Sequence, residues 1–209
     1  HPPSTPIHFS NTCSRMNHVA CQLEALAERH NVHQMTTKSR RTTLQPQHIP
    51  RFVVDDDIFC HFAKVVCTTK CIRRKELFEA WAMALYVQDC FPECRRFADL
   101  ASGQGLLSWA LLVLLGEEGG TRSAVCIDIK MPLATEKLQV AMEKRWPNLC
   151  GQWDFVEAKL EYLEPDSSTL LLGVHCCGIL SDRIIDLAIR GNCPLALVPF
   201  QEVPHPSTS

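Results

Sequence analysis

One stretch, residues 95–115, constrains the fold of this chain more than any other: RRFADLASGQGLLSWALLVLL. It reads as a short strand, a turn with the glycines Gly103 and Gly105, and an apolar helix over 106–115. Glycine permits a tight turn and lets a ligand approach the main chain closely. The first turn of the helix adds unpaired N–H groups and a partial positive charge. The stretch therefore predicts the nucleotide-binding corner of an α/β fold.

The segments after this corner alternate between strand-like and helix-like patterns. This alternation predicts a Rossmann-like α/β fold, with a doubly wound, mostly parallel sheet in the strand order 3-2-1-4-5 and an N-terminal helical extension. The predicted strands are 96–100, 124–129, 153–157, 169–174 and 195–198. The predicted helices are 74–88, 106–115, 132–145 and one more that Ser181 or Asp182 caps.

Composition divides the chain into four zones. Residues 1–54 are a basic, Pro/Ser/Thr-rich tail or linker, 55–92 hold the N-terminal helices of the domain, 93–200 form the cofactor-binding core, and 201–209 are a disordered tail. One helix is predicted at 14–30. For the first zone as a whole, a solvated tail is preferred over a targeting segment or an RNA-contacting element.

The C-terminal end predicts an incomplete sheet. Residues 201–209 contain two prolines and no alternating apolar pattern, so no further strand is expected there. The chain is therefore expected to be a fragment, truncated at its C-terminus, whose fifth strand lies at an open edge. Because an exposed apolar edge favours association, self-association through this edge is expected.

The overall composition is that of a globular protein. The chain has 209 residues, 46% of them hydrophobic, and a net charge of −2, which gives no global attraction to nucleic acid or membranes. Its longest apolar run, 106–115, is too short to cross a bilayer, so no membrane span is expected. The 12 cysteines are too few for a disulfide scaffold in a chain of this length and are expected to be mostly free thiols. This favours an intracellular and cytoplasmic protein, with a nuclear or organellar one left open.

Two cysteine pairs suggest a metal site as an alternative to packing. Cys67/Cys71 and Cys90/Cys94 could present thiolates from two helices to one zinc ion. Structural zinc sites more often use C-x2-C turns with glycine, which these pairs lack. We therefore expect packing thiols and no metal.

Two classes of cofactor bind at such a corner, dinucleotides and S-adenosyl-L-methionine, and Asp99 at the end of the first strand indicates which of them fits. A dinucleotide site has the pattern G-x-G-x-x-G, whereas Ser108 holds the third position here. A carboxylate before the turn would repel a pyrophosphate but suits the cationic methionine end of S-adenosyl-L-methionine. The sequence favours this cofactor, bound by Asp99 and by the turn residues Ala101, Ser102, Gly103 and Gly105. An NAD(P)-dependent oxidoreductase and a corner without a ligand stay open as alternatives.

Asp128 ends the second predicted strand, about where α/β nucleotide folds place an acid on ribose hydroxyls. A carboxylate can accept hydrogen bonds from both hydroxyls of a diol. We therefore expect Asp128 to bind the ribose, with Ile129 beside it.

The fourth predicted strand leads into His175, Cys176, Cys177 and Gly178. Strands one and four flank the switch point of such a sheet, so these residues are expected to face the same crevice as the glycine turn. His175 is a candidate for both cofactor binding and general-base catalysis, because histidine titrates near neutral pH. The alternative for His175 is a hydrogen bond to a strand carbonyl. Cys176 is a second catalytic candidate, or packs as a small apolar group.

Three motifs together resemble one group of class I methyltransferases: D-L-A-S-G-x-G-L-L-S-W, V-H-C-C-G-x-L-S-D and P-L-A-L-V-P. This group includes the tRNA acceptor-stem ribose methyltransferases and the methyltransferase domain fused to glutathione-transferase-like modules. The resemblance covers about residues 95–200. The group continues the last motif as V-P-C-C-H, whereas this chain reads V-P-F-Q-E and shows no zinc fingers like those of the tRNA enzymes.

The resemblance implies an S-adenosyl-L-methionine-dependent methyltransferase, with RNA, and tRNA in particular, favoured as the acceptor. Many members place an acid against the adenine amino group. The matching position here is Lys159, and we expect Lys159 and the next residue, Leu160, to lie at the cofactor. Because a lysine cannot replace this acid, backbone groups or Glu157 are expected to bind the adenine amino group. A non-catalytic binding protein with a methyltransferase fold is the main alternative.

Overall fold

A five-stranded parallel sheet forms the centre of the molecule, in the order β3-β2-β1-β4-β5. The computed structural model describes residues 9–30, 41–53, 56–116 and 121–199. The strands are β1 (Arg96–Leu100), β2 (Ser123–Asp128), β3 (Trp153–Glu157), β4 (Thr169–Cys176) and β5 (Leu195–Pro199). The predicted strand order and α/β class are confirmed. Reversal of the strand order between β1 and β4 creates the switch point at which α/β sheets bind ligands.

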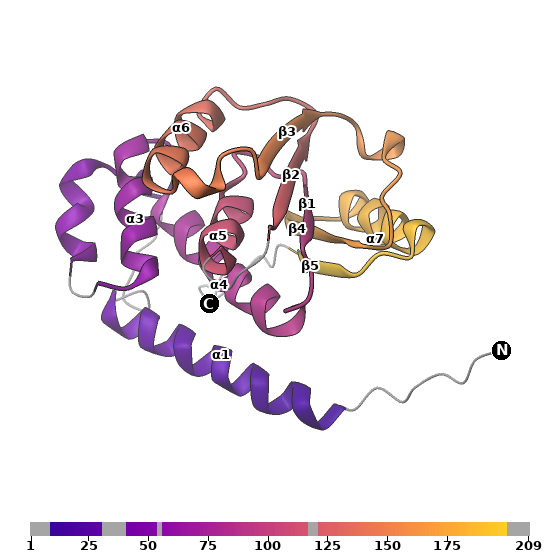
Figure 1. The fold of residues 1–209 in the computed structure, drawn as a ribbon, viewed down its shortest axis with the longest axis horizontal. Coiled ribbons are helices and arrows are strands. Elements are labelled where there is room, and N and C mark those ends of the chain that lie inside the picture. The colour runs from indigo at the N-terminus through magenta and orange to yellow at the C-terminus, as the bar shows by residue number, and fades with distance from the viewer. Residues whose placement is uncertain (1–8, 31–40, 54–55, 117–120, 200–209) are drawn as a thin grey trace, which may run out of the picture.

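Helices cover both faces of the sheet (Figure 1). The α-helices are α1 (Phe9–Arg29), α3 (Ile58–Thr69), α4 (Arg74–Cys90), α5 (Leu106–Leu115), α6 (Thr135–Arg145) and α7 (Ile179–Gly191); the short 3-10 helices are η1 (Pro46–Phe52), η2 (Pro147–Leu149) and η3 (Leu160–Tyr162). Helices α3 to α6 share one apolar core with one face of the sheet. On the other face, α7 packs Ile184, Leu187 and Ala188 against β1 and β4.

The apolar sequence of α5 explains its central place. All but one of its ten residues are buried, among them Trp109, Leu111 and Leu112, which have no exposed surface. A helix that is apolar on every side must be surrounded by protein. Helix α5 lies between α4 and the sheet, and this fixes the position of the half-buried glycine turn at its N-terminus.

Described parts of the segment predicted as a solvated tail, 1–54, pack on the domain. Val19 and Leu26 of α1 are buried in the same apolar core as α4. Leu44 and Phe52 are buried in this core as well. The prediction of a solvated tail is therefore wrong for these described parts. The buried apolar residues of this segment are few and separated by polar ones, so its composition resembles that of a solvated tail.

Several boundaries differ from the predicted ones. Helix α6 begins at Thr135 rather than at Pro132, because Pro132 accepts a turn hydrogen bond from the Thr135 amide. Helix α7 has Gly178 at its N-cap, so the predicted cap by Ser181 or Asp182 is wrong. The hydroxyl of Ser181 instead donates a hydrogen bond to the carbonyl of Cys176, at 2.7 Å. Helix α3 is capped by Asp57, whose Oδ1 accepts a hydrogen bond from the Cys60 amide at 2.7 Å.

Within the described ranges, β5 pairs with β4 and with no other strand. The predicted disordered tail at 201–209 lies outside the described residues. No helix in the described part of the chain is long and apolar enough to span a bilayer.

Candidate cofactor site

A cavity of about 370 Å³ lies at the carboxyl ends of β1 and β4, under helix α4. Its volume falls within the range of small-molecule sites. The glycine turn, the end of β4 and one face of α4 form its walls. It is lined by Ile72, Glu76, Glu79, Ala80, Asp99, Ala101, Ser102, Gly103, Gln104, Leu106, Leu107, Val174, His175, Cys176 and Leu180. The structure thus brings six predicted site residues together around one space: Asp99, Ala101, Ser102, Gly103, His175 and Cys176.

The turn between β1 and α5 has three residues in the left-handed region. Ala101, Gly103 and Gly105 have φ angles of 54°, 55° and 74°. Hydrogen bonds from the Ser102 amide to the Ile127 carbonyl and from the Gly105 amide to the Ser102 carbonyl hold the turn. Ala101 occupies this conformation although its Cβ makes it unfavourable. The turn is therefore imposed by its surroundings rather than by local preference alone.

The two glycines of the turn serve different purposes. A Cβ on Gly103 would meet no atom within 4 Å, so this residue faces open space beside the cavity. A Cβ on Gly105 would lie 2.7 Å from Sγ of Cys126 and 3.0 Å from Cζ2 of Trp153. The space beside Gly105 is therefore filled by protein. We expected this glycine to leave room for a ligand; instead it allows α5 to pack closely on the sheet.

Asp128 supports the glycine turn. Its Oδ2 accepts a hydrogen bond from the Gly103 amide at 2.9 Å, and its Oδ1 accepts one from the Ile129 amide at 2.7 Å. Each oxygen has a further lone pair with which to accept a ligand hydroxyl. The predicted contact of Asp128 with a ribose stays a prediction.

Asp99 is the buried acid of the site. It is 3% exposed, and its Oδ2 accepts a hydrogen bond from the Ser108 hydroxyl at 3.1 Å. Burial raises the pKa of Asp99 to about 7, although the hydrogen bonds from Ser108 act in the opposite direction. An acid with this pKa can ionise readily when a cationic ligand approaches. Ser108, the residue that breaks the dinucleotide glycine pattern, is thus the hydrogen-bond partner of Asp99.

His175 lies at an irregularity of β4. The register of β4 against β5 shifts between Val174 and Cys176, and His175 itself has a φ of 61°. Its Nε2 lies 3.0 Å from Oε2 of Glu79 on α4. Because an ionised carboxylate can only accept, Nε2 carries the proton in this contact. The carboxylate partner, far away in sequence, differs from the strand carbonyl considered for His175.

Cys176 and Cys177 differ in their surroundings. Cys176 is 1% exposed at the cavity wall, and burial raises the pKa of its thiol to about 11. A protonated thiol is a poor nucleophile, so this environment suits the packing role and not the catalytic one. Cys177 is exposed, and its Sγ lies 3.4 Å from the His175 carbonyl.

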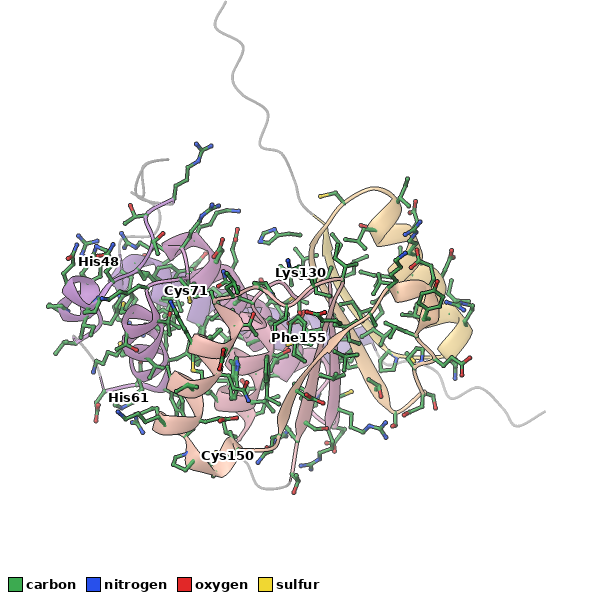
Figure 2. The ribbon with its side chains drawn as sticks, turned by 90° about the horizontal axis from the view of Figure 1, so that it is seen from above. His48, His61, Cys71, Lys130, Cys150 and Phe155 are labelled. Carbon is green, nitrogen blue, oxygen red and sulfur yellow. The ribbon has the colours of Figure 1, made fainter. Side chains whose placement is uncertain are left out.

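The remaining predicted cofactor residues lie away from the cavity wall. Ile129 is 75% exposed, in the loop that Lys130 marks in Figure 2. Lys159 is exposed before η3, and Leu160 packs towards α7. Glu157, considered for adenine recognition, accepts a hydrogen bond from the Met131 amide at 2.8 Å. These residues form a second edge, across the ends of β2 and β3, rather than part of the cavity.

The cysteines considered for zinc do not form a cluster. Burial raises the pKa of Cys67 to about 11 and also raises the pKa values of Cys71, Cys90 and Cys94. Within the described part of the chain, no three His, Cys, Asp or Glu side chains lie close enough to hold a metal ion. The cysteines whose side chains are described are free thiols.

Sequence reasoning did not identify the polar side chains that line the cavity from α4 and from the end of the glycine turn. Glu76 and Glu79 line it from this helix, and Gln104 lines it from the turn. The spacing of the two acids, about one helical turn apart in the first half of α4, is the signal that could have placed them together.

One comparison with known proteins identifies a family. Residues 75–199 match a family model described as a methyltransferase domain. No curated protein matches this sequence. A solved structure of an uncharacterized protein from Burkholderia thailandensis is similar over 82% of this chain and 42% of its own, at 14% identity and a TM-score of 0.32; this chain thus spans less than half of that protein. The family model covers more than half of the chain and includes every residue that lines the cavity except Ile72. The chain therefore belongs to the methyltransferase domain family, and its sheet has the class I strand order.

Proposed function

We propose that this protein transfers a methyl group from S-adenosyl-L-methionine, bound in the cavity between α4 and the glycine turn. The observation that carries the proposal is the buried Asp99, at the end of β1 and on the wall of this cavity. A cationic ligand stabilises the ionised form of a buried acid. The ammonium and sulfonium groups of this cofactor are cations, whereas a pyrophosphate would be repelled.

The cavity fits such a cofactor in three further respects. Gly103 leaves open space where a side chain would stand. The carbonyl oxygen Oε1 of Gln104 is buried and has no hydrogen-bond partner among the described residues, so it can accept from a ligand N–H group. The apolar part of the lining, including Leu106, Leu107 and Leu180, suits the uncharged surface of the ligand.

When bound, the cofactor supplies an electrophilic methyl group on a positively charged sulfur. Asp99 and the turn hold and orient the ligand, α4 shields it from water, and His175 stands at the wall as the candidate proton acceptor. Positioning supplies much of the rate enhancement in a displacement of this kind.

Calorimetric titration with S-adenosyl-L-methionine, S-adenosylhomocysteine and NAD⁺ tests the proposal. We expect the first two to bind and NAD⁺ not to bind. The variant Gly103→Val should weaken both sulfur ligands, because its side chain fills the open space beside the cavity. Binding of NAD⁺ alone would instead support the oxidoreductase alternative. Cofactor binding without transfer to any acceptor would favour a non-catalytic protein.

RNA is the proposed acceptor, on the strength of the basic residues in 1–54. Among them, Arg29 and Arg51 lie in the described part, whereas Lys38 and Arg40 lie outside the described residues. If phosphates are bound, affinity for RNA should fall steeply with salt, because neutralised phosphates release counterions. Salt-independent binding of RNA, or none, would shift the proposal to a protein or small-molecule acceptor.

A further inference from the structure

The contact between His175 and Glu79 joins parts of the chain that are far apart in sequence. His175 projects from the bulge of β4, and Glu79 comes from the middle of α4; both line the cofactor cavity. A non-glycine residue with positive φ is unfavourable unless the surrounding structure holds it there. Bulges next to active sites commonly redirect one side chain. The backbone of β4 is thus distorted at the residue whose side chain reaches Glu79.

Glu79 divides its two oxygens between two partners. Its Oε2 faces Nε2 of His175 at 3.0 Å, and its Oε1 pairs with Nζ of Lys75 at 2.8 Å, one helical turn earlier. Both oxygens of the carboxylate that contacts the imidazole are therefore engaged, one by the histidine and one by the lysine. Because His175 and Glu79 are both about one-third or more exposed, this arrangement is reachable from solvent and from an incoming substrate.

We propose that Glu79 is a positioning residue for His175, holding its imidazole in the Nε2–H tautomer so that the pair accepts the proton of the methyl acceptor. This inference rests on the proposed methyl transfer. In the step, the acceptor atom forms a bond to the methyl carbon while the carbon–sulfur bond breaks, and its electron pair stays on the sulfur. Because Nε2 already carries a proton, the acceptor's proton passes to Nδ1 of the imidazole; the carboxylate of Glu79 stabilises the positive charge, and the proton then leaves to solvent.

The tautomer is tested without any acceptor by ¹⁵N spectra of the histidine side chains, with His175→Gln to assign the signal. We expect an Nε2–H imidazole in the wild-type protein and a mixture of tautomers in Glu79→Ala. The variant Glu79→Gln keeps an oxygen that accepts from Nε2–H, so it should keep the tautomer. As a matched control, Glu143→Ala removes a carboxylate on α6 that bonds to Gln139 instead, and should leave the signal unchanged.

Transfer is measured with methyl-labelled S-adenosyl-L-methionine and two acceptor pools, total small RNA and a heat-treated protein extract. Glu79→Ala and Glu79→Gln should both lower the rate about 100-fold, the lower end for loss of acid–base catalysis. Cofactor affinity should fall by much less than the rate of transfer, because Asp99 and the turn hold the cofactor. The double variant Glu79→Gln/His175→Gln should be no slower than His175→Gln alone.

The outcomes separate the inference from the proposed function. If the wild type fails to bind the cofactor, the proposed function fails, and the imidazole spectrum still decides whether Glu79 sets the tautomer. If the wild type binds and transfers, but Glu79→Ala transfers equally fast or keeps a single Nε2–H tautomer, only the inference is overturned. Additive losses in the double variant would also overturn it.

Discussion

The backbone amide of Gly103 donates a hydrogen bond to Oδ2 of Asp128, at 2.9 Å, which joins the glycine turn to the end of β2. The acid expected to bind the cofactor ribose therefore also sets the shape of the turn on which the cofactor would lie. A substitution at Asp128 acts on both.

We expect Asp128→Ala to weaken cofactor binding by about 1.5–3 kcal/mol, the range for a hydrogen bond to a charged group. A 2′-deoxy analogue of the cofactor should bind the wild type more weakly, yet lose little further affinity on the variant. Calorimetry on wild type and variant, each with the cofactor and with its 2′-deoxy analogue, gives the coupling energy between Asp128 and the 2′-hydroxyl. Fully additive losses would show that Asp128 supports the turn and does not touch the ribose.

The two glycines of the turn offer a matched comparison. Gly103→Ala and Gly105→Ala place a Cβ at similar positive φ, so both carry a similar backbone cost of about 1–2 kcal/mol. Only the second forces its methyl group against Cys126 and Trp153. Urea denaturation should therefore show Gly105→Ala to be less stable than Gly103→Ala by about 1–3 kcal/mol. Equal stabilities of the two variants would mean that Cys126 and Trp153 can shift away from the new methyl group without loss of stability.

Stability should depend on pH through Asp99. Its pKa is about 7 in the folded protein and near 3.8 when unfolded, so the folded state binds more protons between these values. Stability then falls as pH rises from about 4 to 7 and is level above. Asp99→Asn removes this dependence while keeping an acceptor for Ser108. Urea denaturation at pH 5 and pH 8 measures the free energy of unfolding of both proteins. The stability of the variant relative to the wild type should be greater at pH 8 than at pH 5.

The cofactor should reverse this preference for the protonated acid. A cation next to Asp99 favours ionisation, so affinity for S-adenosyl-L-methionine should rise with pH through about 7 in the wild type and stay flat in Asp99→Asn. If affinity depended on pH in the same way in the wild type and in Asp99→Asn, the cationic groups of the cofactor would not lie next to Asp99.

Adjacent cysteines should react at different rates. Iodoacetamide at pH 8 should label the exposed Cys177 and spare Cys176, which is buried and has a raised pKa of about 11. Mass spectrometry of the labelled peptides, in native buffer and in urea, measures both sites. Rapid native labelling of Cys176 would restore it as a candidate nucleophile.

The parts of the fold that the sequence predicted are those with local patterns. The strands and helices alternate along the chain, which predicted the strand order, and the glycine turn predicted the position of the cavity. The pairing of Glu79 with His175 joins α4 to β4 across the cavity, and no local pattern encodes such a contact. The purpose of Gly105 was also hidden, because its reason is the bulk of Trp153 on another strand.

The packing around Gly105 has an optical consequence. Trp109 and Trp153 stack with ring centroids 5.3 Å apart and an angle of 19° between planes, next to the glycine and beneath the turn. Both indoles are shielded from solvent. Their near-ultraviolet circular dichroism and emission report on this corner, so the protein carries a built-in chromophore pair with which loosening of the turn can be followed without any added label.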